Sequence, residues 1–482
     1  MGAGIARVAA TAGHPVLLYD ARAGVAAAAL SAMRGDLERQ AARGKMSRAD
    51  ADAAGGRIAI VDALAEVAPA HLAIEAIVED RAAKIALFRE LEEIVAPSAL
   101  LATNTSSISV TAIAGGLRHP ERCVGMHFFN PAPVMKLVEI VRPLAASSAA
   151  VETAVRTAEA WGKHALVVPS TPGFVVNRVA RPLYAEALRT LAAPAEPSDI
   201  DAAMTESGGF RMGPFALMDL IGNDVNFAVT RSVFEAFAYE RRFAPSLAQQ
   251  ALVDAGRFGR KTGRGFYDYS AEPAIPAPHD APLGPPPARV VAHGDLGPAA
   301  ALVDAAETHG IAVRRAEGRE PYLEVDGIAL RLTDGALASE HDRTRPTVLF
   351  DLALDYATCT RIVICAATGN DAALGTAAGF FQRLGKRVSI LPDFPGLVVM
   401  RTVAALANEA ASMLSEGVPA EAIDLGMTLG TNYPLGPLAW AERIGWAHVL
   451  GVLEHASRLL GAERYQPALA SREFARVRTS AG

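Results

Sequence analysis

The 482-residue sequence contains three cysteines, Cys123, Cys359 and Cys365, which form neither a CxxC motif nor a cysteine–histidine metal pattern. This usage argues against a disulfide framework and against a metal site, and it favours the reducing cytoplasm. The sequence also lacks a basic segment followed by an apolar core at its start, so we expect no secretory signal.

Long apolar segments and an excess of one charge are absent as well. The longest uncharged stretch, residues 94–117, is interrupted by Thr, Ser and Asn, so we expect no membrane span. Lys and Arg number 46 against 52 Asp and Glu, a formal net charge of −6. A chain of this charge has no general attraction for nucleic acid or for an anionic membrane surface. With 51% hydrophobic and 20% charged residues, the composition is that of a folded protein of several domains.

Short apolar segments alternate with helical patterns in the N-terminal part of the chain. The strand candidates are residues 16–19, 57–61, 71–77, 100–103 and 122–127. Between them, an Ala-rich stretch at residues 24–44 predicts a helical arm. Such alternation is typical of a parallel sheet covered by helices, so we expect an α/β domain over residues 1–170.

The rest of the chain divides into four parts. Helical patterns predict an all-α module over residues 171–270, and a Pro- and Ala-rich stretch predicts a linker over residues 271–287. Strands alternate with helices again over residues 288–391, which we interpret as a degenerate α/β domain because its glycine set is incomplete. Residues 392–482 predict a second helical module.

The helical module is duplicated. Residues 162–222 recur without a gap at residues 385–445, so that every match has the same offset along the chain. The matches include Gly162-Lys163 with Gly385-Lys386, Glu186-Ala187 with Glu409-Ala410, Ile200-Asp201 with Ile423-Asp424, Gly213-Pro214 with Gly436-Pro437 and Ile221-Gly222 with Ile444-Gly445. A register kept over this length indicates a repeated structural unit.

A glycine-rich helix start and an acid at a strand end suggest a dinucleotide site. Gly2 opens the first helical stretch, and Asp20 follows the strand candidate at residues 16–19. A helix N-terminus binds the pyrophosphate of a dinucleotide, and an acid about 20 residues later binds the ribose. The first strand and first two glycines of that pattern are absent, so a helix start that binds nothing is the alternative. We expect that strand and those glycines to precede Met1 in the complete protein.

Polar residues follow the apolar strand candidate at residues 100–103, in the run Asn104-Thr105-Ser106-Ser107. Ligands of open α/β sheets bind beyond the carboxyl ends of strands, where these side chains would hold polar substrate atoms. A helix N-cap cluster is the alternative, since Ser, Thr and Asn commonly cap helices.

A histidine and a glutamate lie on neighbouring strand candidates. His127 ends one strand, and Glu139 lies inside a near-continuous apolar segment. A buried, unpaired carboxylate is costly, and a His–Glu pair would satisfy it, fix the imidazole tautomer and raise its basicity. Such a pair suits proton abstraction from an alcohol. The alternative is a Glu139 that faces solvent and a His127 that only packs.

Asn177 lies in the opening turn of a helix, in the run PGFVVNR at residues 172–178. The matching position of the duplicated module is Met400. The fold of the module therefore does not need an amide there, which favours a functional role for Asn177 over helix packing.

Together these motifs resemble the 3-hydroxyacyl-CoA dehydrogenase family. The similarity covers residues 1–270 and resumes in the second helical module. The stretches that carry it are residues 74–80 (IEAIVED), 104–108 (NTSSI), 125–131 (GMHFFNP), 172–178 (PGFVVNR) and 212–215 (MGPF). The resemblance implies an α/β Rossmann-like NAD-binding domain followed by all-α C-terminal modules, here duplicated. The long form is similar to bacterial enzymes that handle 3-hydroxybutyryl-CoA or 3-hydroxyadipyl-CoA in fatty-acid β-oxidation or phenylacetate degradation.

The resemblance also implies catalytic roles. His127 would be the catalytic base that takes the proton of the 3-hydroxyl, and Glu139 its orienting partner. Ser106 and Asn177 would hold the substrate oxygen. The substrate would be an acyl-CoA.

For the cofactor, the resemblance implies NAD. Gly2 would open the helix at the pyrophosphate, and Asp20 would bind the adenosine ribose, where a carboxylate repels the 2′-phosphate of NADP. The residues implied to lie along the nicotinamide are Glu79, Lys84, Asn104 and Asn130. Lys45 and Arg48 on the helical arm either meet CoA phosphates or form a solvated, charged tip.

Several alternatives stay open from the sequence. The family's single-module members dimerise through the helical module, whereas here we expect the two copies to pack against each other within one chain, and a homo-oligomer is not excluded. Because half of the phosphate loop is absent, we expect weak NAD binding, and a structural or binding protein is an alternative function. A dehydrogenase of a free hydroxy acid is another. The sequence does not fix the acyl chain length or a preference for a distal carboxylate.

Overall fold

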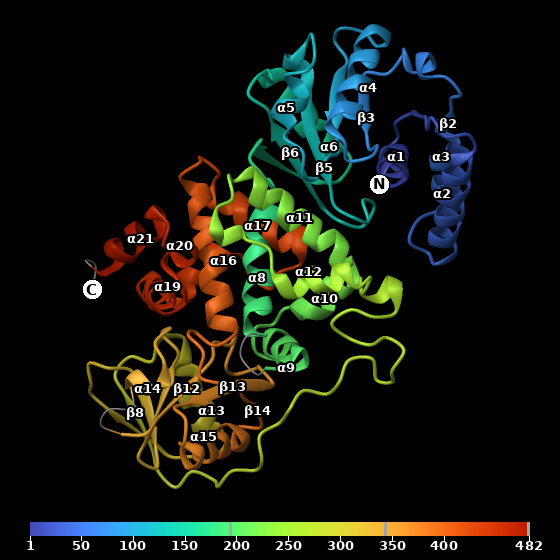
Figure 1. Cartoon of the computed structure of the whole chain (residues 1–482). Coiled ribbons are helices and arrows are strands. Elements are labelled where there is room, and N and C mark those ends of the chain that lie inside the picture. The colour runs from blue at the N-terminus through green and yellow to red at the C-terminus, as the bar shows by residue number, and fades with distance from the viewer. Residues whose placement is uncertain (192–194, 342–344, 480–482) are drawn as a thin grey trace. The chain divides into compact units, whose positions relative to one another are not determined.

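The computed structural model describes residues 1–191, 195–341 and 345–479 (Figure 1). The chain forms two compact units. The first consists of residues 1–177 with 429–431, and the second of residues 178–428 with the described residues from 432 onward. Each is described by itself.

The first unit contains a five-stranded sheet in the order β3-β4-β5-β6-β7. Its strands are β3 (Leu72–Glu75), β4 (Leu100–Thr103), β5 (Cys123–Phe128), β6 (Leu137–Arg142) and β7 (His164–Pro169). All neighbouring strands are parallel except β5 and β6, which are antiparallel. The expectation of a purely parallel sheet is therefore wrong at β6, because the connection at residues 129–136 is too short for a crossover helix.

Alternate residues of the central strands face two different helix layers. Leu100 and Ala102 of β4 pack with residues of α6 (Ser148–Ala160), whereas Leu101 packs with residues of α4 (Arg81–Ile94) and α5 (Val110–Ala114). This period of two is what a strand buried on both faces requires. Because β3, β4 and β5 are parallel, their carboxyl ends share one edge of the sheet.

The N-terminal segments form a smaller sheet. Strands β1 (Val16–Leu18) and β2 (Ile58–Ile60) pair in parallel, beside the helices α1 (Gly2–Thr11), α2 (Val25–Ala42) and α3 (Arg48–Gly56). Helix α1 connects the two hydrophobic cores, because Ile5 packs in the core of the five-stranded sheet while Ala6 and Ala10 pack with α2 and β2. Within the described residues, no strand joins β1 to β3. The expected additional strand remains a prediction.

The second unit contains both copies of the helical module. The first copy has α8 (Arg181–Thr190), α9 (Pro197–Ala202), α10 (Pro214–Ile221), α11 (Asn223–Ala236) and α12 (Leu247–Asp254). The second has α16 (Val399–Leu414), α17 (Ala420–Thr431), α18 (Pro437–Ile444), α19 (Trp446–Leu460), α20 (Ala462–Tyr465) and α21 (Leu469–Thr479). The corresponding helices α8 and α16 lie side by side (Figure 1).

Two reciprocal ion pairs join the copies. Arg178 Nε donates to Glu409 Oε1 at 2.6 Å, and Arg401 Nε donates to Glu186 Oε2 at 2.7 Å. All four side chains are buried. Because the two arginines and the two glutamates are equivalent in the repeat, the pairs are related by an approximate twofold axis, as in a symmetric dimer interface. The expected packing of the two copies within one chain is confirmed.

Equivalent residues also meet each other or repeat the same contact. The rings of Phe210 and Tyr433, which occupy matching positions of the repeat, are 5.1 Å apart in an edge-to-face arrangement, which places both near the axis. In each copy an aspartate, Asp201 or Asp424, accepts two backbone N–H groups at the start of the next helix. A Cβ on the preceding Gly213 or Gly436 would overlap that carboxylate, which explains why both copies have glycine there.

We expect Arg401→Met to destabilise the second unit by about 3–5 kcal/mol, because it leaves the carboxylate of Glu186 buried without its cation. Thermal denaturation would detect this as a lower melting temperature. The double variant Arg401→Met/Glu186→Leu should recover part of the loss. A melting temperature of Arg401→Met equal to that of the wild type would contradict this account of the interface.

The degenerate α/β domain is a seven-stranded sheet in the order β14-β13-β12-β11-β10-β8-β9. Its strands are β8 (Val290–His293), β9 (Val313–Ala316), β10 (Tyr322–Val325), β11 (Ile328–Leu332), β12 (Thr347–Phe350), β13 (Arg361–Ala366) and β14 (Arg387–Ile390), with helices α13 (Ala301–Thr308), α14 (Ala338–His341) and α15 (Asp371–Arg383). Strands do not simply alternate with helices as expected, because β10 and β11 form an antiparallel hairpin. Its two-residue turn, Asp326-Gly327, has positive φ at both residues, the conformation that Asp-Gly favours.

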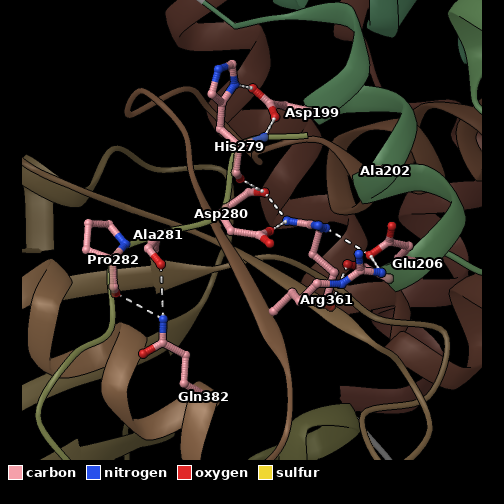
Figure 2. A network of polar contacts seen from close by, with 12 residues as sticks. Asp199, Ala202, Glu206, His279, Asp280, Ala281, Pro282, Arg361 and Gln382 are labelled. Carbon is pink, nitrogen blue, oxygen red and sulfur yellow. Dashed lines mark hydrogen bonds and ion pairs between the residues drawn. The ribbon is translucent and has the colours of Figure 1, made fainter. Parts of the chain in front are cut away.

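The expected linker at residues 271–287 is bound to the degenerate domain over part of its length. Ala281 donates its N–H to the carbonyl of Val388 on β14 at 2.7 Å. The Gln382 side chain of α15 donates to the carbonyls of Ala281 and Pro282 at 3.2 and 3.0 Å (Figure 2). This segment therefore lies against β14 and α15.

A buried arginine joins this segment to the first helical module. Arg361 of β13 is fully buried and donates to Asp280 at 2.6 Å and to Glu206 at 2.9 Å (Figure 2). Next to it, His279 contacts Asp199 of α9 at 3.0 Å. These partners are far apart in the sequence, so composition alone indicated only a linker.

Candidate active site

His127 and Glu139 form a buried pair at the carboxyl end of β5. The two residues are directly opposite each other in the antiparallel ladder of β5 and β6. His127 Nδ1 lies 2.7 Å from Glu139 Oε2, and the carboxylate is completely buried. The alternative of a solvent-facing Glu139 is therefore wrong. Because the carboxylate accepts, Nδ1 carries the proton and Nε2 keeps its lone pair for a substrate proton.

The second oxygen of Glu139 stabilises the start of a helix. Glu139 Oε1 accepts the N–H groups of Val175 at 2.9 Å and Val176 at 3.0 Å, where α7 (Val176–Val179) begins. The rings of Phe129 and Phe174 lie 4.6 and 5.6 Å from the imidazole ring of His127. Backbone amides thus hold Glu139, and aromatic rings pack against His127.

The predicted substrate-oxygen ligands lie together. Asn177 Nδ2 is 3.4 Å from the backbone carbonyl of Ser106. Asn104 lies at the end of β4, and its Oδ1 accepts the N–H of Phe128 at 2.9 Å, which ties the polar loop to the residue after His127. The end of β4 and the end of β5 therefore form one cluster of polar groups.

A charged network supports the loop that contains Ser106. Lys84 Nζ lies 2.9 Å from Glu75 and 3.3 Å from Glu79, and the lysine side chain is 1% exposed. Glu79 Oε1 accepts the N–H groups of Ser106 at 3.0 Å and Ser107 at 3.1 Å. Glu79 therefore holds the loop at residues 104–107 directly, and Lys84 supports it through Glu79. Glu75 was not predicted from the sequence, because only the packing shows its burial with Lys84.

The pKa of Glu79 is lower than its ordinary value. Burial would raise this pKa, but hydrogen bonds from Thr105, Ser106 and Ser107 and the positive charge of Lys84 outweigh burial. The carboxylate is therefore ionised at neutral pH and remains an acceptor for the loop.

Three of the residues expected around a dinucleotide follow a strand or open a helix of the first unit. Asp20 follows β1 and accepts from Arg22, and the hydrogen bonds of Arg22 lower the pKa of Asp20. Gly2 opens α1, and no side chain among the described residues caps this helix N-terminus, which leaves its first amides for a phosphate. Asn130 is exposed at the start of the turn between β5 and β6. These positions fit a dinucleotide.

A basic cavity of ≈ 320 Å³ lies on the first unit. The residues that line it are Arg7, Asp36, Arg39, Gln40, Arg43, Lys45, Pro133 and Val134. Of the two arm residues considered from the sequence, Lys45 lines this cavity, whereas Arg48 pairs with Asp52 on the exposed surface. The three arginines were not predicted from the sequence, although Arg39 and Arg43 have the four-residue spacing of one helix face.

The duplicated half has no carboxylate at the position of Glu139. Glu139 pairs with Leu166 on β7, and Val363 pairs with Ser389 on β14. Leu166 and Ser389 occupy matching positions of the repeat, since each lies four residues after the matching glycine, Gly162 or Gly385. Val363 therefore occupies the glutamate position.

The same register places an aspartate where the first copy has its histidine. Asp351 donates its N–H to the carbonyl of Val363, across from it in the sheet. Its buried carboxylate accepts the N–H groups of Val398 at 2.9 Å and Val399 at 2.8 Å. Asp351 thus retains the helix contact of the first copy without a catalytic pair. At these two positions the second copy therefore has Asp351 and Val363 in place of the histidine and the glutamate.

The cavity beside this second copy is small. It measures ≈ 40 Å³ and is lined by Trp440, Arg443 and Ile444 of α18 together with residues 352–356. A ligand pocket for a small molecule usually measures about 300–1,000 Å³. This cavity is therefore well below the usual size of a small-molecule site.

Sequence comparison assigns both halves of the chain. Residues 1–171 match the 3-hydroxyacyl-CoA dehydrogenase NAD-binding domain, and residues 173–269 and 396–479 match the C-terminal domain of the same family. The chain belongs to the 3-hydroxyacyl-CoA dehydrogenase family. Residues 330–395 match the reduced Rossmann-fold domain of 3-hydroxybutyryl-CoA dehydrogenase. The chain is thus an NAD-dependent oxidoreductase that acts on the 3-hydroxyl of 3-hydroxyacyl-CoA.

Relatives exist in a long and a short form. The 3-hydroxyadipyl-CoA dehydrogenase of Escherichia coli K12 is 43% identical over 97% of this chain and 94% of its own length. A crystal structure of 3-hydroxybutyryl-CoA dehydrogenase from E. coli K12 superposes with a TM-score of 0.89 and 41% identity, covering 100% of this chain and 97% of that one. A probable 3-hydroxybutyryl-CoA dehydrogenase of Bacillus subtilis is 40% identical over 56% of this chain and 94% of its own length.

Two negative observations apply to the described parts of the chain. None of the helices there combines the length and the apolar character needed to cross a membrane. The same residues include no group of three or more His, Cys, Asp or Glu side chains that could hold a metal ion.

We expect Glu139→Gln to lower kcat by about 10²-fold or more, because an amide cannot stabilise an imidazolium at His127. The glutamine oxygen can still accept the amides at the start of α7, so the melting temperature should change little. Initial rates of NADH formation and thermal denaturation would measure the two effects. Asp351→Asn is the matched control in the second copy and should leave kcat unchanged; a normal kcat for Glu139→Gln would contradict the proposed pair.

Proposed function

We propose that His127 is the catalytic base of this 3-hydroxyacyl-CoA dehydrogenase. Its Nε2 removes the proton of the 3-hydroxyl, and Glu139 stabilises the imidazolium that forms. Ser106 and Asn177 hold the oxygen as it becomes a carbonyl. NAD, when bound, accepts the hydride from C3. The single observation that carries this proposal is the completely buried carboxylate 2.7 Å from His127 Nδ1.

For NAD itself, we propose that Gly2 lies at the pyrophosphate and Asp20 at the adenosine ribose. Asn104 and Asn130 would face the nicotinamide side, with Glu79 and Lys84 supporting it through the loop at residues 104–107. The ionised Asp20 favours NAD over NADP because it would repel a 2′-phosphate.

We propose that the basic cavity binds the phosphorylated end of CoA. Arg7, Arg39, Arg43 and Lys45 supply four positive charges, and Asp36 is the only acidic residue among the lining residues given for the cavity. Guanidinium groups bind phosphate through charge-assisted, often bidentate hydrogen bonds. This charge favours a CoA thioester over a free hydroxy acid.

The acyl group is the finer part of the proposal. The long relative is named for 3-hydroxyadipyl-CoA, so we propose a 3-hydroxyacyl-CoA with a distal carboxylate as the better substrate. Comparison of kcat/KM for 3-hydroxyadipyl-CoA and 3-hydroxybutyryl-CoA tests this, and a higher value for the butyryl thioester would reject it. We further propose action in the cytoplasm, in β-oxidation or phenylacetate degradation.

We expect His127→Gln to lower kcat by about 10²–10⁴-fold, because it removes the general base. The dissociation constant of NAD, measured by fluorescence titration of NADH or by calorimetry, should change little. The wild type should form NADH from 3-hydroxybutyryl-CoA and not from free 3-hydroxybutyrate. Near-normal turnover by His127→Gln would reject the assignment of the base.

A second prediction concerns CoA. We expect Arg43→Ala to raise the KM for 3-hydroxybutyryl-CoA by about tenfold with little change in kcat, because a phosphate contact is lost. Arg48→Ala is the matched control, since Arg48 lies on the same arm outside the cavity lining and pairs with Asp52. Equal KM values for the two variants would reject the cavity as the CoA site.

A further inference from the structure

The Gly-Lys dipeptide of the repeat ends a helix in the same way in both copies. Gly162 and Gly385 have φ values of +70° and +75°. The next residue donates its N–H back into the helix, from Lys163 to Ala158 at 3.0 Å and from Lys386 to the corresponding carbonyl at 3.1 Å. This is the Schellman arrangement, which fixes the backbone of each lysine before the strand begins.

The ammonium groups of both lysines hold a loop between antiparallel strands. Lys163 is buried, and its Nζ donates to the carbonyls of Ala132 at 2.6 Å and Met135 at 2.8 Å, in the turn between β5 and β6. Lys386 is also buried and donates to the carbonyl of Cys359 at 2.9 Å, in the connection between β12 and β13. The contact is therefore part of the architecture of each copy.

In the first copy a basic cavity of ≈ 320 Å³ lies against this turn, whereas the cavity lined by residues 352–356 of the corresponding connection in the second copy measures ≈ 40 Å³. Pro133 and Val134, which lie between the two carbonyls that Lys163 binds, line the basic cavity. The turn is also in contact with α1, since a Cβ on Gly4 would lie 3.3 Å from Ala132. A shift of this turn would move a wall of the cavity.

We propose that Lys163 is a positioning residue for acyl-CoA binding: from behind, its ammonium fixes the turn at residues 132–135, which forms one wall of the basic cavity. This inference rests on the proposed function of that cavity as the site of the CoA phosphates. Lys386 makes the corresponding contact in the half without a catalytic pair. Comparison of variants at the two lysines therefore distinguishes a purely structural role from a role in binding.

The positive charge of Lys163 also favours binding of the CoA phosphates. Burial, together with the positive charges of Lys136 beside β6 and Arg7 on α1, lowers the pKa of Lys163 to about 8. The ammonium form therefore prevails at pH 7. It adds a positive charge next to a cavity that four cationic side chains already line.

The test compares Lys163→Met and Lys386→Met in the full chain. We expect Lys163→Met to raise the KM for 3-hydroxybutyryl-CoA by about tenfold, with kcat within about twofold of the wild type. Lys163→Arg should restore most of the affinity. Lys386→Met should leave KM unchanged, although thermal denaturation should show that both methionine variants lose stability. If Lys163→Met does not fold, Lys163→Gln provides the same comparison.

A truncated substrate identifies which part of the thioester is affected. With 3-hydroxybutyryl-pantetheine, which lacks the phosphorylated nucleotide of CoA, Lys163→Met and the wild type should have the same KM. An unchanged KM for the CoA thioester, an equal change for both thioesters, or an equal effect of Lys386→Met would overturn the role of Lys163. A silent Arg43→Ala would instead reject the cavity as the CoA site, and with it this inference.

Discussion

The buried carboxylate of Glu139 links the start of α7 to His127, and the proposed chemistry of the first unit depends on it. A charge without water is tolerated only when each oxygen has partners. Here one oxygen accepts two backbone amides at the start of α7, and the other contacts His127 Nδ1. The contact of Glu139 on β6 with the start of α7 therefore fixes the orientation of the His127 imidazole. In the proposed mechanism, the fold orients the base before any substrate binds.

The duplicated half shows the same architecture without the chemistry. Asp351 stabilises the start of α16, yet Val363 and Met400 replace the glutamate and the amide of the first copy. What the second copy keeps is the interface, where Arg178 and Arg401 bind reciprocal glutamates. The two modules of this chain therefore pair with each other through equivalent surfaces.

Part of this arrangement could be predicted from the sequence for definite physical reasons. Glu139 is a single carboxylate in an apolar strand, so its burial requires a partner. Comparison of the two copies of the repeat singled out Asn177, because the second copy has Met400 at that position. The hairpin of β10 and β11 and the direction of β6 were not predicted, because a period of two does not distinguish parallel from antiparallel neighbours. The basic cavity brings together α1, α2 and a distant turn, which only tertiary packing determines.

The tautomer of His127 tests the central claim most directly. Nitrogen-15 NMR of the enzyme labelled in its histidines, with His127→Gln used to assign the signals, reports which ring nitrogen carries the proton. The pair with Glu139 predicts a neutral ring protonated at Nδ1, with Nε2 unprotonated and free to accept the substrate proton. A neutral ring protonated at Nε2 would contradict the account, because that nitrogen could not then act as the base.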